Sequence, residues 1–309
     1  MEMTVKIDKL NRLRKERNAV ILAHYYQDPE IQDIADFNGD SLALAQIAKQ
    51  TNADVILFCG VHFMAETAKI LNPEKIVIIP DMKAACSLAD SAPKDEFAKW
   101  ISEHPGHTVI SYINCSSDVK AMSDIICTSS NASKIVNSVP KEVPILFAPD
   151  KYLGNYLIKK LGREMVLWNG SCQVHEIFSE REVINLMNKY PEAAVLAHPE
   201  CPENILAYAD FIGSTTAIIN AGATWKEKDF IILTEPGVIH QMKKLAPEKN
   251  FIPVSSLEGC SCNECPYMRL NTIDKMITAL ETLQPQINID EALRIRAAKP
   301  LEKMLELSK

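Results

Sequence analysis

Short apolar runs recur along the chain and alternate with longer segments that have the periodicity of amphipathic helices. Three of these runs resemble one another: AVILAHYYQ (19–27), HTVISYINC (107–115) and AAVLAHPEC (193–201). Runs of this length that are rich in branched apolar residues are typical of buried strands. Each run contains an imidazole or a phenol near its end, followed by further polar residues. The pattern therefore predicts three similar strands with polar, chemically versatile ends.

The segments after these strands repeat as well. His24, Tyr112 and His198 stand at equivalent positions of the three runs, 88 and then 86 residues apart. Each run is followed by a short strand with small hydroxyl residues, a helical segment, a buried strand, another helix and a last strand. The segments with the hydroxyl residues are ADFNGDS (35–41), SDIICTSS (123–130) and ADFIGSTT (209–216). Length alone suggests about two domains, but a repeat of roughly 85 residues predicts three.

The alternation of strands and helices predicts the fold class. It indicates an α/β protein with parallel sheets that are covered by helices on both faces. We expect three homologous α/β/α sandwich domains with small parallel sheets, arranged with pseudo-threefold symmetry around a central active site. The expected limits are 1–90, 91–177 and 178–265, followed by C-terminal helices in 266–309 that pack on the first domain.

Helical periodicity marks both ends of the chain. It predicts helices over 3–17 and 269–283, and a final helix over about 290–307. Pro300 lies inside this last segment and has no backbone N–H, so we expect the final helix to bend or break there.

Polar residues at the strand ends predict where the site lies. In open parallel sheets, ligands bind beyond the carboxyl ends of the strands. Each predicted domain contributes two polar side chains at that edge: His24 and Tyr26, Tyr112 and Asn114, and His198 and Glu200. Convergence of the three edges would place these side chains in one central site.

Each repeat ends in cysteine, which suggests a metal centre. Cys86 closes the first repeat and Cys172 the second, while EGCSCNECPYM (258–268) closes the third. Three thiolates from three domains would leave one metal position open, which fits an iron–sulfur cluster better than structural zinc, since the latter prefers four closed ligands. The spacing does not select the third ligand cleanly, because Cys260 lies 88 residues beyond Cys172 and Cys265 lies 93 beyond it.

Composition narrows the class of protein. The chain is 47% hydrophobic and 24% charged, as is usual for a globular protein, and it contains no apolar run long enough to cross a membrane. The N-terminus lacks the apolar core of a secretory signal, so we expect a cytoplasmic protein. In that reducing compartment the nine cysteines favour metal binding or catalysis over disulfides. A net charge of -7 disfavours nucleic acid as a partner.

Small hydroxyl residues stand where helices are predicted to begin. They are Ser41, Ser129, Ser214 and Thr215. Helix N-termini with free N–H groups and hydroxyls bind anions, whereas plain capping of the helix is the alternative interpretation for any one of them.

Together these segments resemble the quinolinate synthase family, and the resemblance covers essentially the whole chain. The motifs that carry it are ILAHYYQ with QDIADFNGDS (21–41), GVHFMAETAKILNP (60–73), YINCS (112–116), CTSSNA (127–132), APDKYLG (148–154), GSCQVH (170–175), AHPEC (197–201), ADFIGST (209–215) and CPYMRLNT (265–272).

The resemblance implies an activity. The family is a transferase- or lyase-type group of condensing enzymes that join iminoaspartate to dihydroxyacetone phosphate, giving quinolinate, phosphate and two waters in de novo NAD biosynthesis. It implies three domains around a 4Fe–4S cluster whose open iron acts as a Lewis acid, with Cys86, Cys172 and Cys265 as the cluster ligands. The small-molecule partners would be the two substrates, with iminoaspartate supplied by L-aspartate oxidase or aspartate dehydrogenase, and with no nucleic acid or membrane partner.

Roles for the polar residues follow from the chemistry and the resemblance together. Condensation and loss of water need positioned acids and bases, for which we expect Glu200, Tyr26, His24 and His198. The residues expected to bind substrate are His24, Ser41, Tyr112, Asn114, Ser129, His175, His198, Glu200, Ser214 and Thr215.

The sequence departs from the family pattern in two places. Tyr25 stands in HYYQ where an Asn is common, and the cysteines near the end are spaced CxCxxC where some members have CxxCxxC. Cys260 and Cys262 are therefore candidates for a redox pair with Cys265 or for simple neighbours of the cluster.

The other cysteines and two lysines define the alternatives. Cys59 and Cys127 fit the role of small buried apolar residues, while Cys115 and Cys201 are reserve ligands near the strand ends. A closed zinc site in the cysteine-rich segment is one alternative function. A metal-free aldolase with a Schiff-base lysine is another, for which Lys120 or Lys151 would be the candidates.

Overall fold

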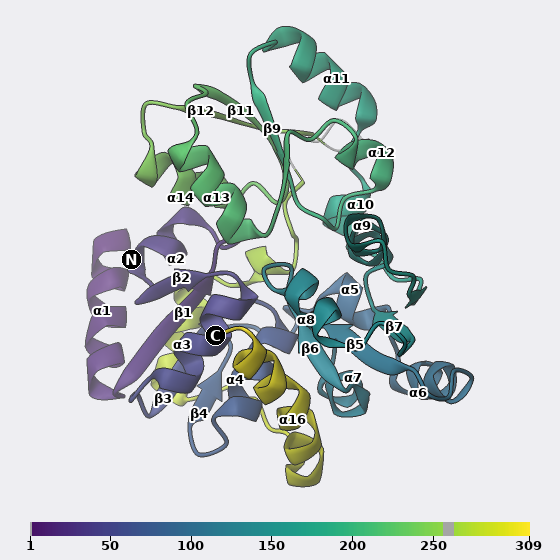
Figure 1. Ribbon diagram of the computed structural model, residues 1–309. Helices are drawn as coiled ribbons and strands as arrows, with labels where there is room; N and C mark the ends of the chain where they lie inside the picture. The colour runs from purple at the N-terminus through teal and green to yellow at the C-terminus, as the bar shows by residue number, and fades with distance from the viewer. Residues whose placement is uncertain (1, 256–262) are drawn as a thin grey trace.

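Three small parallel sheets form the framework of the protein. The computed structural model describes residues 2–255 and 263–309. Each sheet has four strands, and the strand order is β2-β1-β3-β4 in the first, β6-β5-β7-β8 in the second and β10-β9-β11-β12 in the third. The connectivity is thus the same in all three, and it confirms the α/β class with three similar sheets that the alternation of strands and helices predicts. In Figure 1 the third sheet forms an upper lobe above the other two.

The strands are short; the two central strands of each sheet are almost completely buried, whereas most edge strands are partly exposed. Their bounds are β1 Ala19–His24, β2 Phe37–Gly39, β3 Val55–Cys59, β4 Ile76–Ile78, β5 Thr108–Tyr112, β6 Ile125–Cys127, β7 Ile145–Ala148, β8 Val166–Leu167, β9 Ala194–Ala197, β10 Phe211–Ile212, β11 Asp229–Leu233 and β12 Asn250–Pro253. All pairs between neighbouring strands of these sheets are parallel, so the carboxyl ends of each sheet face the same edge.

Helices follow the strands in the predicted order. Their bounds are α1 Met3–Glu16, α2 Pro29–Ile34, α3 Ser41–Gln50, α4 His62–Leu71, α5 Ser87–Asp90, α6 Lys94–Ser102, α7 Ser117–Met122, α8 Ala132–Ser138, α9 Lys151–Leu161, α10 Gln173–Glu176, α11 Glu180–Lys189, α12 Glu203–Leu206, α13 Thr215–Thr224, α14 Val238–Leu245, η1 Met268–Leu270, α15 Ile273–Thr282 and α16 Glu291–Leu307. None of these helices is both long and apolar enough to cross a membrane. The limits of the three domains stay a prediction.

One aspartate in each repeat fastens the first two strands together. The carboxylate of Asp36 accepts a hydrogen bond from the backbone N–H of Ile21, Asp124 does the same for Val109, and Asp210 for Val195, each at 2.8 Å. The three pairs have the same separation of 15 residues. A buried backbone N–H needs a partner, and the same solution in each repeat shows that the three units share one local design.

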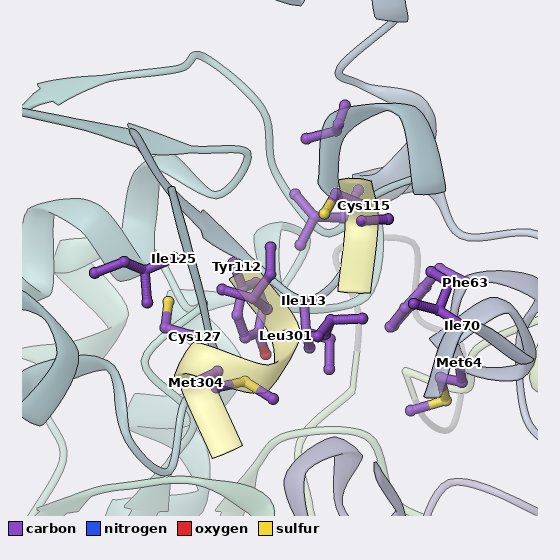
Figure 2. Packing of buried hydrophobic residues seen from close by; sticks show 14 of the residues in the cluster. Phe63, Met64, Ile70, Tyr112, Ile113, Cys115, Ile125, Cys127, Leu301 and Met304 are labelled. Carbon is purple, nitrogen blue, oxygen red and sulfur yellow. The ribbon is translucent and has the colours of Figure 1, made fainter. Parts of the chain in front are cut away.

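The first two domains and the last helix share one hydrophobic core. Buried residues of β1, β3 and α4 belong to the same cluster as those of β5, β6, β7 and α7, and α16 contributes Leu301 and Met304. Figure 2 shows these two side chains in the same cluster as Phe63 of the first domain and Tyr112 of the second. The third domain instead has its own buried clusters on the two faces of its sheet.

The C-terminal helices brace more than one domain. Helix α15 packs against α1 and β3 of the first domain, whereas α16 packs against α7 and β6 of the second as well as α4 of the first. Pro300 lies inside α16, which nevertheless runs as one helix from Glu291 to Leu307, so the expectation of a break there is wrong. The burial of Ala297 and Leu301 on either side of the proline explains why the helix persists, since packing outweighs one lost hydrogen bond.

Candidate active site and metal centre

A cavity lies where the carboxyl ends of the three sheets meet. Its empty volume is about 710 Å³. The residues that line it include most of those predicted from the sequence: His24, Tyr26, Ser41, Cys86, Tyr112, Asn114, Ser129, Cys172, His175, His198, Glu200, Thr215 and Cys265. Convergence of side chains that lie up to about 240 residues apart is what the pseudo-threefold arrangement predicts.

Equivalent hydroxyls from the three repeats line this cavity. Ser41, Ser129 and Thr215 each stand five residues after the aspartate that fastens the first two strands of their repeat. The neighbouring Ser214 caps α13, because its hydroxyl accepts a hydrogen bond from the backbone N–H of Ala217 at 3.3 Å, and it is not among the lining residues. For Ser214 the structure therefore shows a capping hydrogen bond, and its contact with substrate stays a prediction.

Glu200 occupies the centre of the polar network. The hydroxyl of Tyr112 donates a hydrogen bond to Glu200 Oε1 at 2.6 Å, and His175 Nδ1 lies 3.1 Å from Oε2. Burial alone would raise the pKa of this carboxyl, but the adjacent His175 and the hydrogen bond from Tyr112 hold its pKa below the ordinary value. Glu200 is therefore a buried carboxylate that is ionised near neutral pH.

Two histidines repeat the same local geometry. The backbone N–H of Tyr26 donates to His24 Nδ1 at 3.2 Å, and the backbone N–H of Glu200 donates to His198 Nδ1 at 3.4 Å. Burial lowers the pKa of His24 to about 4 and that of His198 to about 3. Both rings are thus neutral at pH 7, and because Nδ1 accepts a hydrogen bond, Nε2 carries the proton. The Nε2 of His198 lies 3.2 Å from the hydroxyl of Ser129.

A phenol and two threonines complete the polar wall. The hydroxyl of Tyr26 lies 3.2 Å from Thr215 Oγ1 and 3.0 Å from Thr234 Oγ1. Thr234 also lies 3.0 Å from His175 Nε2. Burial raises the pKa of Tyr26 well above its usual range, so this phenol keeps its proton.

The three cysteines favoured by the family resemblance are close together in the cavity wall. Cys86 and Cys172 stand at the starts of α5 and α10, and Cys265 precedes η1. Burial raises the pKa of all three thiols, to about 12 for Cys86. Cys172 also forms a group with His175 and Glu200 whose ligand atoms lie within 4.8 Å of one another. Three thiols in the wall of one cavity suit a metal cation, which stabilises the thiolate form.

The remaining cysteines lie elsewhere or outside the described residues. Cys59, Cys115, Cys127 and Cys201 are free and fully buried, and none of them lines the central cavity. Cys260 and Cys262 lie outside the described residues, so the choice between Cys260 and Cys265 rests on the placement of Cys265 alone.

The two lysines considered for Schiff-base chemistry do not line the cavity. Lys120 is fully buried and donates to the backbone carbonyl of Cys115, while Lys151 pairs with Glu176 at 3.3 Å. Neither ammonium group is placed to attack a substrate in this cavity.

The structure adds residues that the sequence analysis did not select. Asp40 lines the cavity, and its carboxylate accepts hydrogen bonds from Ser130 of the second domain at 2.8 Å and Thr216 of the third at 2.7 Å. Thr234 and Glu235 follow β11, the central buried strand of the third repeat. The signal that could have found them is the end of the second buried strand in each repeat, since parallel strands all end at one edge.

Comparisons with known proteins point to one family. The sequence profile of a family described as Quinolinate synthetase A protein matches residues 8–306. A quinolinate synthase of Nostoc sp. is 59% identical over 299 residues, which cover 97% of this chain and 92% of that protein. One of Microcystis aeruginosa is 59% identical over 97% of this chain and 94% of its own length. One of Cyanophora paradoxa is 57% identical over 98% and 92%, respectively.

Proposed function

This chain belongs to the quinolinate synthetase A family, and we propose that it condenses iminoaspartate with dihydroxyacetone phosphate to form quinolinate, phosphate and two waters in de novo NAD biosynthesis. The observation that carries the proposal is the meeting of three thiols and one buried carboxylate in the same cavity. Cys86 comes from the first repeat, Cys172 from the second, and Glu200 and Cys265 from the third. Cys172, His175 and Glu200 also lie close enough together to bind one metal ion.

The thiols support a 4Fe–4S cluster held by Cys86, Cys172 and Cys265. All three lie in the wall of one cavity, and cysteine thiolates are the usual ligands of such clusters. When bound by three thiolates, the cluster leaves one iron free to polarise a substrate oxygen as a Lewis acid.

The hydroxyls of the three repeats support the binding of an anionic substrate. Ser41 and Thr215 begin helices of ten residues, whose N-terminal N–H groups and dipoles attract phosphate and carboxylate groups. Because the whole chain carries a net charge of -7, these local dipoles supply an attraction that the overall field does not. Asn114 and Ser129 would orient the carbonyl or carboxylate end.

Glu200 is the general base of this proposal, and Tyr26 is the complementary acid. The Glu200 carboxylate is ionised because of the adjacent His175 and the hydrogen bond from Tyr112, while the buried phenol of Tyr26 keeps its proton. Neutral His24 and His198 can donate from Nε2 to a substrate carbonyl or carboxylate, and the Tyr112 hydroxyl orients the base.

His175 and Thr234 join the base to the acid. The chain of contacts runs from Glu200 through His175 to the Thr234 hydroxyl and on to Tyr26, with 3.1, 3.0 and 3.0 Å between successive atoms. His175 Nδ1 has no hydrogen bond with any described residue in this arrangement, so return of a proton from Glu200 to the Tyr26 hydroxyl would require the imidazole to turn towards the carboxylate. Glu200 and Tyr26, the two ends of this series of contacts, line the cavity, whereas Thr234 is buried behind its wall.

The first experiment measures metal and activity together. Protein purified without oxygen should contain about four iron and four sulfide per chain, and Cys172→Ala should lose both. Glu200→Gln should keep the iron but make quinolinate about a hundredfold more slowly or less. Stoichiometric zinc without sulfide, or quinolinate formation that survives loss of the iron, would overturn the proposal.

The supply of substrate is also part of the proposal. Iminoaspartate is an unstable imine, so an enzyme that oxidises aspartate must produce it nearby, either L-aspartate oxidase or aspartate dehydrogenase. We place this step in the cytoplasm, which agrees with the reducing environment that free cysteines require.

A further inference from the structure

An ion pair between the buried Glu235 and the half-buried Arg269 stands next to Cys265 but outside the central cavity. The carboxylate of Glu235 is fully buried, and its Oε1 lies 2.8 Å from Nη2 of Arg269. The other oxygen, Oε2, accepts a hydrogen bond from the backbone N–H of Gly237 at 2.7 Å. Neither Glu235 nor Arg269 lines the cavity, so neither can touch a substrate bound there. A buried carboxylate is costly to desolvate, which raises the question of what this pair positions.

Both residues of the pair contact the backbone of Cys265, Glu235 through its side chain and Arg269 through its backbone N–H. The backbone N–H of Cys265 donates to Glu235 Oε1 at 3.3 Å, and the carbonyl of Cys265 accepts from the backbone N–H of Arg269 at 3.4 Å. Cys265 belongs to no helix or strand. Its backbone is therefore held by these two contacts rather than by regular secondary structure.

The same arginine reaches the first domain. Arg269 Nη1 donates to the backbone carbonyl of Tyr26 at 2.6 Å and lies 3.3 Å from the carboxylate of Asp28. Its Nε lies 3.5 Å from Glu264. The guanidinium thus contacts three segments: the loop after β1 that carries Tyr26, the loop that carries Cys265, and Glu235 at the end of β11. The planar fork of arginine suits this role, because it can bind several oxygens in fixed directions.

We propose that Glu235 and Arg269 are positioning residues that fix Cys265 relative to Tyr26, so that the metal centre and the proton-transferring phenol keep their relative placement. The proposal rests on the proposed function only in treating Cys265 as a metal ligand. Thr234, which precedes Glu235, contacts Tyr26 from the other side. Two adjacent residues at the end of β11 therefore contact both groups: Thr234 contacts the Tyr26 hydroxyl, and Glu235 contacts the backbone of Cys265.

The test uses cluster-free full-length protein, so that it does not depend on activity. The rate of alkylation of each cysteine by iodoacetamide is measured by peptide mass spectrometry, with Cys172 of the same chain as the internal reference. Arg269→Met should raise the rate at Cys265 by about tenfold, since the loop opens more often without its charged partner. Glu235→Gln keeps one carbonyl oxygen, which can accept from the Cys265 N–H while the Gly237 N–H loses its acceptor, so it should raise the Cys265 rate by less than Arg269→Met does, about threefold or less.

A matched control separates this role from general stability. Lys244→Met also removes a cation that joins the third domain to the first, because Lys244 pairs with Asp33 at 2.9 Å on the surface. It should leave the Cys265 rate unchanged. If Arg269→Met does not fold, Glu235→Ala decides instead, with the same tenfold expectation. Equal Cys265 rates in the test and control variants, at matched melting temperatures, would overturn the proposal.

Iron retention gives a second readout. After anaerobic loading, Arg269→Met should lose iron to a chelator about tenfold faster than Lys244→Met does. If the protein binds no iron at all, the proposed function fails while the alkylation result still decides the role of Glu235 and Arg269. If iron loads normally and neither readout moves, the positioning role fails and the proposed function stands.

Discussion

The first and second domains meet each other very differently from the way both meet the third. The first two share one apolar core, which α16 completes with Leu301 and Met304. The third domain has its own cores and meets the others through polar groups, among them Tyr26 with Thr234, Tyr112 with Glu200, and Gln32 with Gly237. Figure 1 shows this domain as the upper lobe.

This difference explains why the chemistry lies where it does. An apolar interface offers no donors, acceptors or acids, and it can separate only by exposing hydrophobic surface to water. The polar seam, by which we mean the contacts between the third domain and the other two, presents titratable groups to the cavity. Water can replace many of its hydrogen bonds. The first two domains and α16 are thus joined mainly by apolar packing, whereas the third domain supplies polar groups to the cavity wall.

The largest expected effect comes from opening the shared core. Leu301 is fully buried in α16, so Leu301→Ala leaves a cavity and should lower the free energy of unfolding by about 3 kcal/mol. Ile295 lies on the same helix but is exposed, so Ile295→Ala is the matched control and should have little effect. Urea denaturation measures both. Equal losses in the two variants would mean that α16 does not complete a common core.

The free energy of unfolding should depend on pH through titratable groups near the polar seam and not through the apolar core. The pKa of buried His24 is about 4, below that of an unfolded histidine, so the unfolded chain binds more protons between these values. The free energy of unfolding should therefore fall by about 2 kcal/mol as the pH drops from 6.5 towards 4.

Two variants sharpen this prediction. His24→Asn keeps an acceptor for the backbone N–H of Tyr26 but does not titrate, so the loss on acidification should become smaller; the slope that remains comes in part from His198. Leu301→Ala should keep the full slope. A slope unchanged by His24→Asn would show that the dependence arises elsewhere.

A smaller effect is expected from the buried amide that joins the first and third domains. Gln32 is 1% exposed, and its Nε2 donates towards the carbonyls of Gln27 at 2.8 Å and Gly237 at 3.0 Å. Gln32→Leu leaves these carbonyls without that donor and should cost about 2 kcal/mol or less. Hydrogen exchange should rise at the seam, around residues 235–241, and stay unchanged in β5. The exposed Gln50→Leu serves as the control.

The smallest effect is expected at the surface edge of the seam. Lys244 and Asp33 are both about half exposed, so Lys244→Met should change the free energy of unfolding by about 0.5 kcal/mol or less. Thermal denaturation at low and high salt measures it. A loss as large as that of Gln32→Leu would show that surface charges, rather than buried hydrogen bonds, hold the third domain in place.

Much of the fold could be predicted because the repeat is visible in the residues. The strands ending near His24, Tyr112 and His198 follow from short apolar runs, and the parallel order follows from their alternation with helices. The continuity of α16 through Pro300 could not be predicted in this way. Local propensity argues against it, and the core that overrides that propensity forms only in the folded chain.

The candidate site was predictable to the extent that its residues end the first strand of each repeat. The sequence analysis did not select Asp40, Thr234 and Glu235, because their roles depend on partners that lie far away in the sequence. Arg269 was the hardest to foresee. A lone arginine after a cysteine gives no sign that it reaches the backbone of Tyr26, more than 240 residues earlier.

The junction at Asp40 has a consequence for symmetry. Three similar domains surround the cavity, yet their meeting point needs one acceptor, Asp40, and two donors, Ser130 and Thr216. Three identical repeats would bring either three mutually repelling carboxylates to this point or none. Gene triplication can therefore build such a scaffold, but only divergence between the copies can form the hydrogen bonds of Asp40 with Ser130 and Thr216. A homotrimer made from a single repeat could not reproduce it.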